Sequence, residues 1–112
     1  MDDFPVFMKN MANAVPPQYQ SPGVTGWFYD GIGNQMAYWI CERDGASQEH
    51  QHEFEEYLVV LQGVYTLIVN NQKHVLQKGD EYFIPPGVPH SGEFVAGTRT
   101  IHCFGGSRVK RP

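Results

Sequence analysis

The side-chain types and the spacing of His50, His52 and Glu56 indicate a functional site. Histidines at positions i and i+2 cannot share a helix face, but on a β-strand they point to the same side. Glu56 lies four residues after His52, and it keeps that side if the strand resumes after a short turn. Two imidazoles and a carboxylate on one face are typical of the start of a metal site.

His90 follows a loop that contains Pro85, Pro86, Gly87 and Pro89. Prolines leave the loop few conformations, and the glycine permits a bend that other residues resist, so the loop can place one side chain accurately. With the first three residues, His90 completes a set of three nitrogens and one oxygen. This set suits one divalent transition metal such as Fe, Mn, Ni, Zn or Cu. An octahedral ion would keep two positions open for water or substrate, as catalytic sites do.

Short strand-like runs separated by turns surround these residues. The expected strands are residues 24–29, 35–42, 56–61, 64–69, 74–76, 81–84 and 98–104. Asn70-Asn71 predicts a hairpin turn, because asparagine tolerates positive φ. Strands at intervals of about ten residues with no helix between them predict an all-β fold, an antiparallel sandwich or barrel.

The chain divides into an N-terminal arm (1–20), a barrel (21–107) and a short basic tail (108–112). Apolar residues in the arm recur at three- and four-residue spacing between Pro5 and Pro16-Pro17, which predicts one amphipathic helix of about two or three turns. Those residues are Phe4, Phe7, Met8, Met11 and Val15. Such a stripe can pack on its own domain or on a partner subunit. Together with apolar residues on both faces of 56–61, it favours a homodimer.

Composition narrows the class of protein. The 112 residues carry a net charge of −4 and no basic cluster outside the tail, which argues against a nucleic-acid partner. No apolar run reaches transmembrane length and no signal-peptide pattern opens the chain, so a cytoplasmic protein without membrane contact is expected. Cys41 and Cys103 are too few for a disulfide scaffold, and both are expected to be buried free thiols.

Two spaced motifs resemble those of the cupins. The first is Gly45…His50-x-His52-x3-Glu56-x6-Gly63, with one residue fewer than usual before the first histidine. The second is Gly79-x5-Pro85-x-Gly87-x2-His90, and Phe94 stands where an asparagine is common. The resemblance covers about residues 24–106 and implies a small RmlC-like, cupin-2 type barrel, a jelly-roll double-stranded β-helix. It also implies that His50, His52, Glu56 and His90 bind the metal.

The last strand carries a weaker resemblance, to small cupins that convert unsaturated uronic acids in pectin and alginate breakdown. Those proteins have an acid where this chain has His102, followed by an aromatic residue at Phe104 and an arginine at Arg108. Histidine can also move protons near neutral pH, so His102 is the catalytic acid–base candidate. The alternative is a hydrogen-bonded histidine of the core.

The remaining pocket candidates are aromatic and basic residues. Tyr38, Tyr65 and Phe104 are expected in the core or the wall of a small-molecule pocket. Arg108 is either a clamp for a substrate carboxylate or a solvated charge of the tail. His74 is expected to be exposed and outside the site.

Three functions fit these residues. The first is a metal-dependent isomerase or lyase step on a sugar acid or similar carbonyl compound, with His102 or a neighbouring tyrosine moving the proton. The second is an iron-dependent dioxygenase. The third is a ligand-binding or sensory module that performs no reaction.

Overall fold

Residues 3–111 are described by the computed structural model, which within that range contains nine strands and three short 3₁₀ helices. The helices are η1 (Val6–Met8), η2 (Met11–Asn13) and η3 (Pro17–Tyr19). The strands are β1 (Val24–Asp30), β2 (Gln35–Cys41), β3 (Gly45–Ala46), β4 (Glu56–Gln62), β5 (Val64–Val69), β6 (Gln72–Gln77), β7 (Glu81–Ile84), β8 (His90–Phe94) and β9 (Arg99–Phe104). Of these, β3 and β8 were not expected from the sequence.

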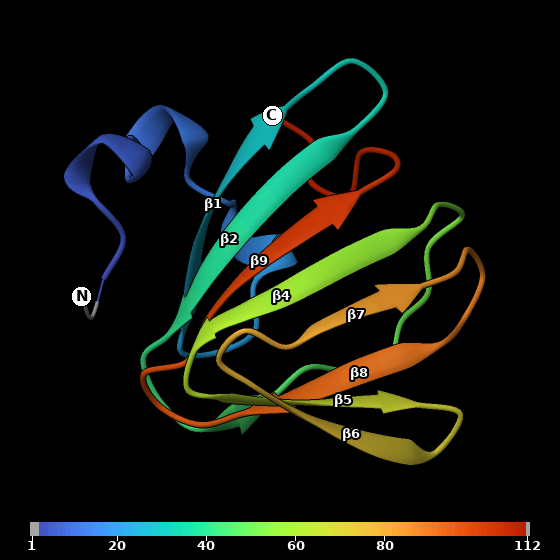
Figure 1. The fold of residues 1–112 in the computed structure, drawn as a ribbon. Coiled ribbons are helices and arrows are strands. Elements are labelled where there is room, and N and C mark those ends of the chain that lie inside the picture. The colour runs from blue at the N-terminus through green and yellow to red at the C-terminus, as the bar shows by residue number, and fades with distance from the viewer. Residues whose placement is uncertain (1–2, 112) are drawn as a thin grey trace.

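The strands form two antiparallel sheets that face one another (Figure 1). One sheet has the order β1-β2-β9-β4-β7, and the other has the order β3-β8-β5-β6. Neighbours in space are often distant in sequence, because β9 lies between β2 and β4. This arrangement confirms the prediction of an all-β, antiparallel jelly-roll barrel.

The core lies between the two sheets. Burial alternates along β4, where Leu58 and Val60 are fully buried and Tyr57 faces outward. Leu67 on β5 and Ile84 on β7 pack against them from the facing layer and the sheet edge. The other end of the barrel is filled by Val15, Phe28, Ala37, Trp39, Phe104 and Val109. The space between the two apolar clusters is where polar side chains of the site are placed.

The N-terminal arm is not the single amphipathic helix that its spacing predicts. It forms the three 3₁₀ turns, and the Asn10 side chain accepts a hydrogen bond from the amide of Ala12, which starts a new turn. The apolar stripe therefore splits: Phe4 is 4% exposed, whereas Phe7 is 78% exposed. A helix would need both on one face, and the interrupting turns prevent this.

The described part of the arm packs on its own barrel, in blue beside β1 and β2 in Figure 1. Phe4 makes edge contacts with Trp27 and Tyr38 on the outer face of the five-stranded sheet. Phe4 thus packs in cis, whereas Phe7 and Met11 are exposed, and packing of the arm on a partner subunit stays a prediction. Residues 1–2 of the expected arm and residue 112 of the expected tail lie outside the described residues.

The tail also folds back onto the barrel. Val109 is 2% exposed, and the Arg111 guanidinium bonds to Asp30, to the Ala12 carbonyl and to Asn13. These contacts join the C-terminal segment to the end of β1 and to the arm. No helix within residues 3–111 is long and apolar enough to cross a membrane.

Two turns have the backbone that the sequence predicts. Asn70 and Asn71 have φ of 53° and 61°, the left-handed pair that a two-residue hairpin requires between β5 and β6. Gly63 has φ of 80° between β4 and β5. The Asn70-Asn71 turn keeps β5 and β6 in register, whereas the Gly63 turn carries the chain from one sheet to the other, where buried residues of β4 and β5 pack together.

Candidate metal centre

The loop between β3 and β4 carries His50 and is joined to the start of β8 by backbone hydrogen bonds. The amide of His50 donates to the carbonyl of His90, and the amide of His90 donates to the carbonyl of His50, each at 2.9 Å. The proline-rich loop is fixed in the same way, because the amide of Gly87 donates to the carbonyl of His52 at 2.7 Å. Main-chain bonds therefore bring together histidines that are 40 residues apart in sequence.

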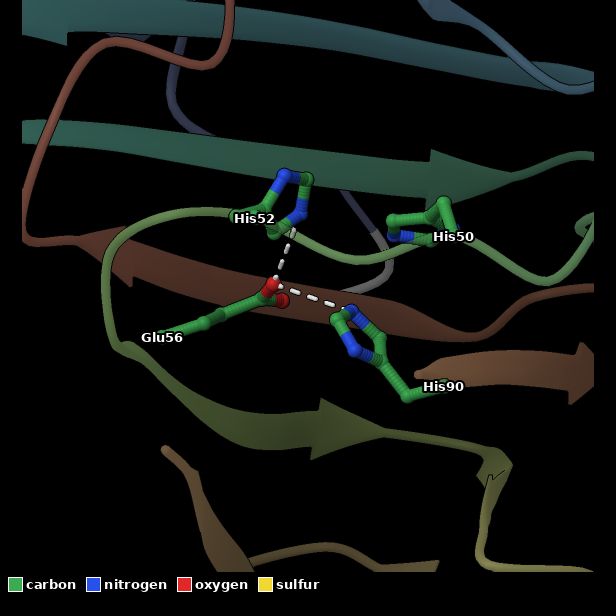
Figure 2. Close-up of side chains that lie close together, drawn as sticks. All are labelled: His50, His52, Glu56 and His90. Atoms are coloured by element: carbon green, nitrogen blue, oxygen red, sulfur yellow. Dashed lines mark ion pairs between the residues drawn. The ribbon is translucent and has the colours of Figure 1, made fainter. Parts of the chain in front are cut away.

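The four predicted ligands converge (Figure 2). One ligand atom from each of His50, His52, Glu56 and His90 lies within 4.8 Å of the others. Glu56 Oε1 is 3.4 Å from His52 Nε2 and 3.3 Å from His90 Nε2. Metal–ligand bonds of about 2.0–2.2 Å place neighbouring ligand atoms about 3 Å apart, so these separations fit an ion at the centre.

The polar atoms at the centre of this cluster lack hydrogen bonds. His52 Nε2, Glu56 Oε1 and His90 Nε2 are buried and have no partner with hydrogen-bond geometry. Leaving buried polar atoms unpaired is costly, and a bound cation would satisfy all three at once. The cluster therefore has the ligand types and the unpaired buried atoms that are expected of a divalent metal site.

Backbone carbonyls set the orientation of two of the rings. Nδ1 of His50 donates to the carbonyl of Gln48, and Nδ1 of His90 donates to the carbonyl of Val88, both at 2.9 Å. With the proton on Nδ1, the lone pair of Nε2 is free to face the cluster. The His52 ring is instead held by stacking on Phe54, at a centroid distance of 5.0 Å.

Burial and mutual contacts shift the ionisation of the cluster. Burial lowers the pKa of His50 to about 4, so this ring is neutral near pH 7 and able to ligate. Burial alone would raise the pKa of Glu56, but the hydrogen bond from His102 and the contacts with His52 and His90 hold it well below its usual range. Burial alone would lower the pKa of His90, and the contact with Glu56 raises it above the ordinary value.

His102 lies on the inward face of β9 and is 6% exposed. Its Nδ1 is 2.7 Å from Glu56 Oε2 and its Nε2 is 3.0 Å from Thr100 Oγ1. A carboxylate can only accept, so Nδ1 donates to Glu56, and in the neutral ring Nε2 accepts from the Thr100 hydroxyl. Both ring nitrogens of His102 are thus engaged, next to the cluster rather than within it.

A narrow cavity of about 70 Å³ opens onto the cluster. His50, Glu56, His90 and His102 lie in its wall, and its other residues include Tyr65 and Phe104, Phe94, Ser47, Trp39 and Arg108. A space of this size holds a small group of atoms and excludes a polymer chain. The predicted pocket residues Tyr65, Phe104 and Arg108 are therefore brought together with the predicted ligands.

The prediction that Tyr38 belongs to the pocket is wrong. It does not line the cavity but lies on the outer face of β2, where its hydroxyl bonds to the carbonyl of Met8 in the arm. Side chains alternate along a strand, so its neighbours Ala37 and Trp39 are the ones that face inward. Both faces of β2 are apolar, and this is why the sequence does not distinguish the inward residues from the outward ones.

The guanidinium of Arg108 enters the cavity and has no carboxylate partner within residues 3–111. Its Cζ lies 6.0 Å from the centre of the Phe104 ring. Burial lowers the pKa of the guanidinium, an effect that Glu56 and Tyr65 oppose. The Tyr65 hydroxyl likewise has no hydrogen-bond partner in the described chain, and burial raises its pKa, which keeps it protonated. Two donors in the cavity are thus available to a ligand.

The remaining predictions concern His74 and the two cysteines, of which Cys41 lies in the wall of the cavity. His74 is half-buried against Tyr82, with ring centroids 5.0 Å apart, and does not belong to the cluster. Cys41 is buried as expected, but Cys103 is exposed on the outer face of β9. Thr100 and Ser47 line the cavity, and Gln35 bonds to the backbone of residues 108–109 beside it; the sequence analysis singled out none of these three. Thr100 shares the strand parity of His102, a signal that could have found it, whereas the other two make contacts that only the fold reveals.

The fold and the four-residue cluster define a β-barrel protein with a candidate metal centre of the cupin type. The model of the Cupin domain family matches residues 37–103, more than half of the chain, and the chain belongs to that family. An uncharacterized protein of Methanocaldococcus jannaschii, MJ1618, is 32% identical over 66 residues. That match covers 58% of this chain and 53% of MJ1618, so the chain spans about half the length of this relative.

Solved structures share the fold at low sequence identity. An RmlC-like cupin from Shewanella frigidimarina has a TM-score of 0.76 and 19% identity, with 96% of each chain covered. KdgF from a Halomonas species has a TM-score of 0.69 and 18% identity, covering 80% of this chain and 91% of that one. Salicylate 1,2-dioxygenase from Pseudaminobacter salicylatoxidans has a TM-score of 0.70 and 15% identity, and only 26% of its chain is covered.

Proposed function

We propose that this cupin binds one divalent transition metal through His50, His52, Glu56 and His90 and acts on a small carboxylate-bearing molecule, such as a sugar acid, in an isomerase or lyase step. The observation that carries the proposal is the position of Arg108. An arginine without a carboxylate partner among residues 3–111, in the same cavity as an unsatisfied ligand cluster, supports binding of an anionic group there.

The carboxylate and the reacting end of such a molecule would be held from two sides. Arg108 donates to the carboxylate, and the Phe104 ring beside it supplies an apolar wall. The bound metal would polarise a carbonyl or hydroxyl oxygen of the substrate. Fixing a small substrate at two points restricts its orientation, which is a large part of what a catalyst contributes.

Two residues are candidates for moving the proton, His102 and Tyr65. The nitrogens of His102 are engaged by Glu56 and Thr100, which supports a role in holding the ligand Glu56. The Tyr65 hydroxyl is free of such bonds. Its raised pKa keeps it protonated, so it cannot act as a base, but also makes it a weaker acid, which can donate only to an oxygen that becomes strongly basic during the reaction. We therefore assign proton donation to Tyr65 and positioning of Glu56 to His102.

The test is binding and turnover of small uronates by the metal-loaded chain. Galacturonate should bind to the wild-type protein more tightly than galactose, its uncharged counterpart, and Arg108→Met should remove this preference without lowering the metal content. Equal binding of the two sugars to the wild-type protein would overturn the proposal. Tyr65→Phe should keep galacturonate binding and lose turnover.

Metal analysis and oxygen consumption distinguish the isomerase or lyase step from the dioxygenase alternative. The fold is shared with salicylate 1,2-dioxygenase, and iron in the purified protein together with oxygen consumption on salicylate or gentisate would favour that chemistry. Zinc, manganese or nickel, with no oxygen consumed, would favour the isomerase or lyase step. Ligand binding without turnover of any of these compounds would favour the sensory module.

A further inference from the structure

Gln35, at the start of β2, uses its whole side-chain amide to hold the C-terminal segment. Its Oε1 accepts from the amides of Arg108 and Val109, at 3.0 and 2.9 Å. Its Nε2 donates to the carbonyl of Val109 and to Asp30 Oδ1, both at 2.8 Å. The residue is 1% exposed, so these bonds form inside the protein. All the donors and acceptors of one amide are therefore satisfied.

The segment held by Gln35 is the one that places Arg108 in the cavity. The chain leaves β9 through Gly105 and Gly106. The amide of Gly105 donates to the carbonyl of Glu55, and Gly106 lies against the Phe54 ring. It then turns back to β2, where Val109 packs into the core and the preceding side chain points to the cluster. Without a strand or helix at this position, the backbone needs another source of hydrogen bonds.

We infer that Gln35 is a positioning residue for Arg108 and thereby sets the preference of the cavity for a carboxylate ligand. This inference rests on the proposed role of Arg108 as the carboxylate clamp. Gln35 does not line the cavity, so its effect on a ligand passes through the backbone of residues 108–109.

Burial makes this support specific to the glutamine amide. The core surrounds its side chain, so water cannot replace its bonds to the buried backbone. Arg111 fastens the same segment from the exposed side, to Asp30 and to the arm, but it bonds no atom of residues 108–109. Loss of Gln35 should therefore loosen Arg108 while leaving the tail attached further along.

The first experiment needs no ligand. In the metal-loaded chain, Gln35→Met should speed hydrogen exchange of the Arg108 and Val109 amides at least about tenfold, because both lose Gln35 Oε1, the acceptor that they share. The Nε–Hε NMR signal of Arg108 should also move, since the guanidinium leaves its place at the Phe104 ring. Gln72→Met, at an exposed position on β6, is the matched control and should change neither. If Gln35→Met does not fold, Gln35→Asn keeps the amide but is too short to reach the segment, and the same changes are expected.

The second experiment measures the ligand preference. Gln35→Met should weaken binding of galacturonate about tenfold, the scale of one charge-assisted hydrogen bond, and leave galactose binding unchanged. In an Arg108→Met background, the Gln35 substitution should have no additional effect. Unchanged exchange at residues 108 and 109, or an additional loss in that background, would overturn the inference. If exchange is faster but Arg108→Met still prefers galacturonate, the proposed function fails while the support by Gln35 stands.

Discussion

His102 Nδ1 lies 2.7 Å from Glu56 Oε2, across neighbouring strands β9 and β4. The contact occupies one oxygen of the carboxylate and leaves Oε1 as the atom that faces His52 and His90. Partners of this kind fix the direction of a metal ligand and its mode of binding. His102 therefore influences the candidate centre without belonging to its ligands.

His102→Ala should weaken metal binding about 10- to 100-fold, the range for loss of a partner of a metal ligand. The reason is that His102 is the one hydrogen-bond donor to Glu56 among residues 3–111, so its loss leaves Oε2 without a partner. Competition with a coloured chelator measures the affinity, and the visible spectrum of the cobalt-substituted protein should change as well. Thr100→Ser keeps the hydroxyl and should resemble the wild-type protein, whereas Thr100→Val should show a smaller effect of the same kind. Wild-type affinity in His102→Ala would contradict this role.

The purified protein should contain about one divalent metal per chain, since the four residues form a single site. His52→Ala or His90→Ala should remove it, because each ring supplies a ligand atom buried in the cluster. Elemental analysis gives the stoichiometry. His74→Ala is a matched histidine control outside the cluster and should retain the metal. Full occupancy in both cluster variants would show that the ion binds elsewhere.

The parts of the site that the sequence predicted are those encoded by local spacing. The sequence predicted that His50 and His52 share a face because side chains alternate along a strand. In the structure both lie in the loop between β3 and β4, where His50 forms only an isolated bridge with His90, and they still converge. The loop before His90 has few conformations because of its prolines. The resemblance to cupin motifs then joined the two segments. Strand positions followed from alternating apolar residues and turn signals, which is why most of the barrel was predicted as well.

The parts that were missed depend on contacts between distant segments. Nothing near Gln35 in sequence indicates that it bonds to residues 108–109, which lie more than 70 positions away. Tyr38 was placed in the pocket because both faces of β2 are apolar, and only the packed arm shows which face is outside. The arm itself has helical spacing, but it forms short 3₁₀ turns that bury Phe4 against the sheet and leave Phe7 and Met11 exposed.

The homodimer expected from the sequence stays a prediction. The arm covers part of the outer face of the five-stranded sheet in cis, and Tyr57 and Phe83 on the same sheet are 37% and 57% exposed. Burying such residues in an interface would be favourable. Light scattering should give a mass of two chains, and a mass equal to one chain at micromolar concentrations would refute the dimer.

Gly63→Ala should destabilise the protein more than Gly79→Ala. Both glycines have positive φ, 80° and 89°, so each substitution costs about 1–2 kcal/mol of backbone strain. At Gly63 an added Cβ would also lie 2.7 Å from Thr98 Cα, whereas nothing lies within 4 Å of it at Gly79. The crowding should add at least about 1 kcal/mol to the free energy lost. Urea denaturation of the two variants measures the difference, and equal stabilities would show that Thr98 moves aside freely.

Cys41 should make the folded protein less stable in alkali. Burial raises the pKa of its thiol to about 12, while an unfolded thiol titrates near 8.5. Between these values the folded state binds more protons than the unfolded state, so the free energy of unfolding falls as the pH rises, by about 2 kcal/mol between pH 8 and 10. Cys41→Ala should lose this decrease of the unfolding free energy with pH, and Cys103→Ala, at an exposed position, should keep most of it. The thiols provide a second measurement: at pH 8 the folded chain should react with one equivalent of a thiol reagent, at Cys103, and the denatured chain with two.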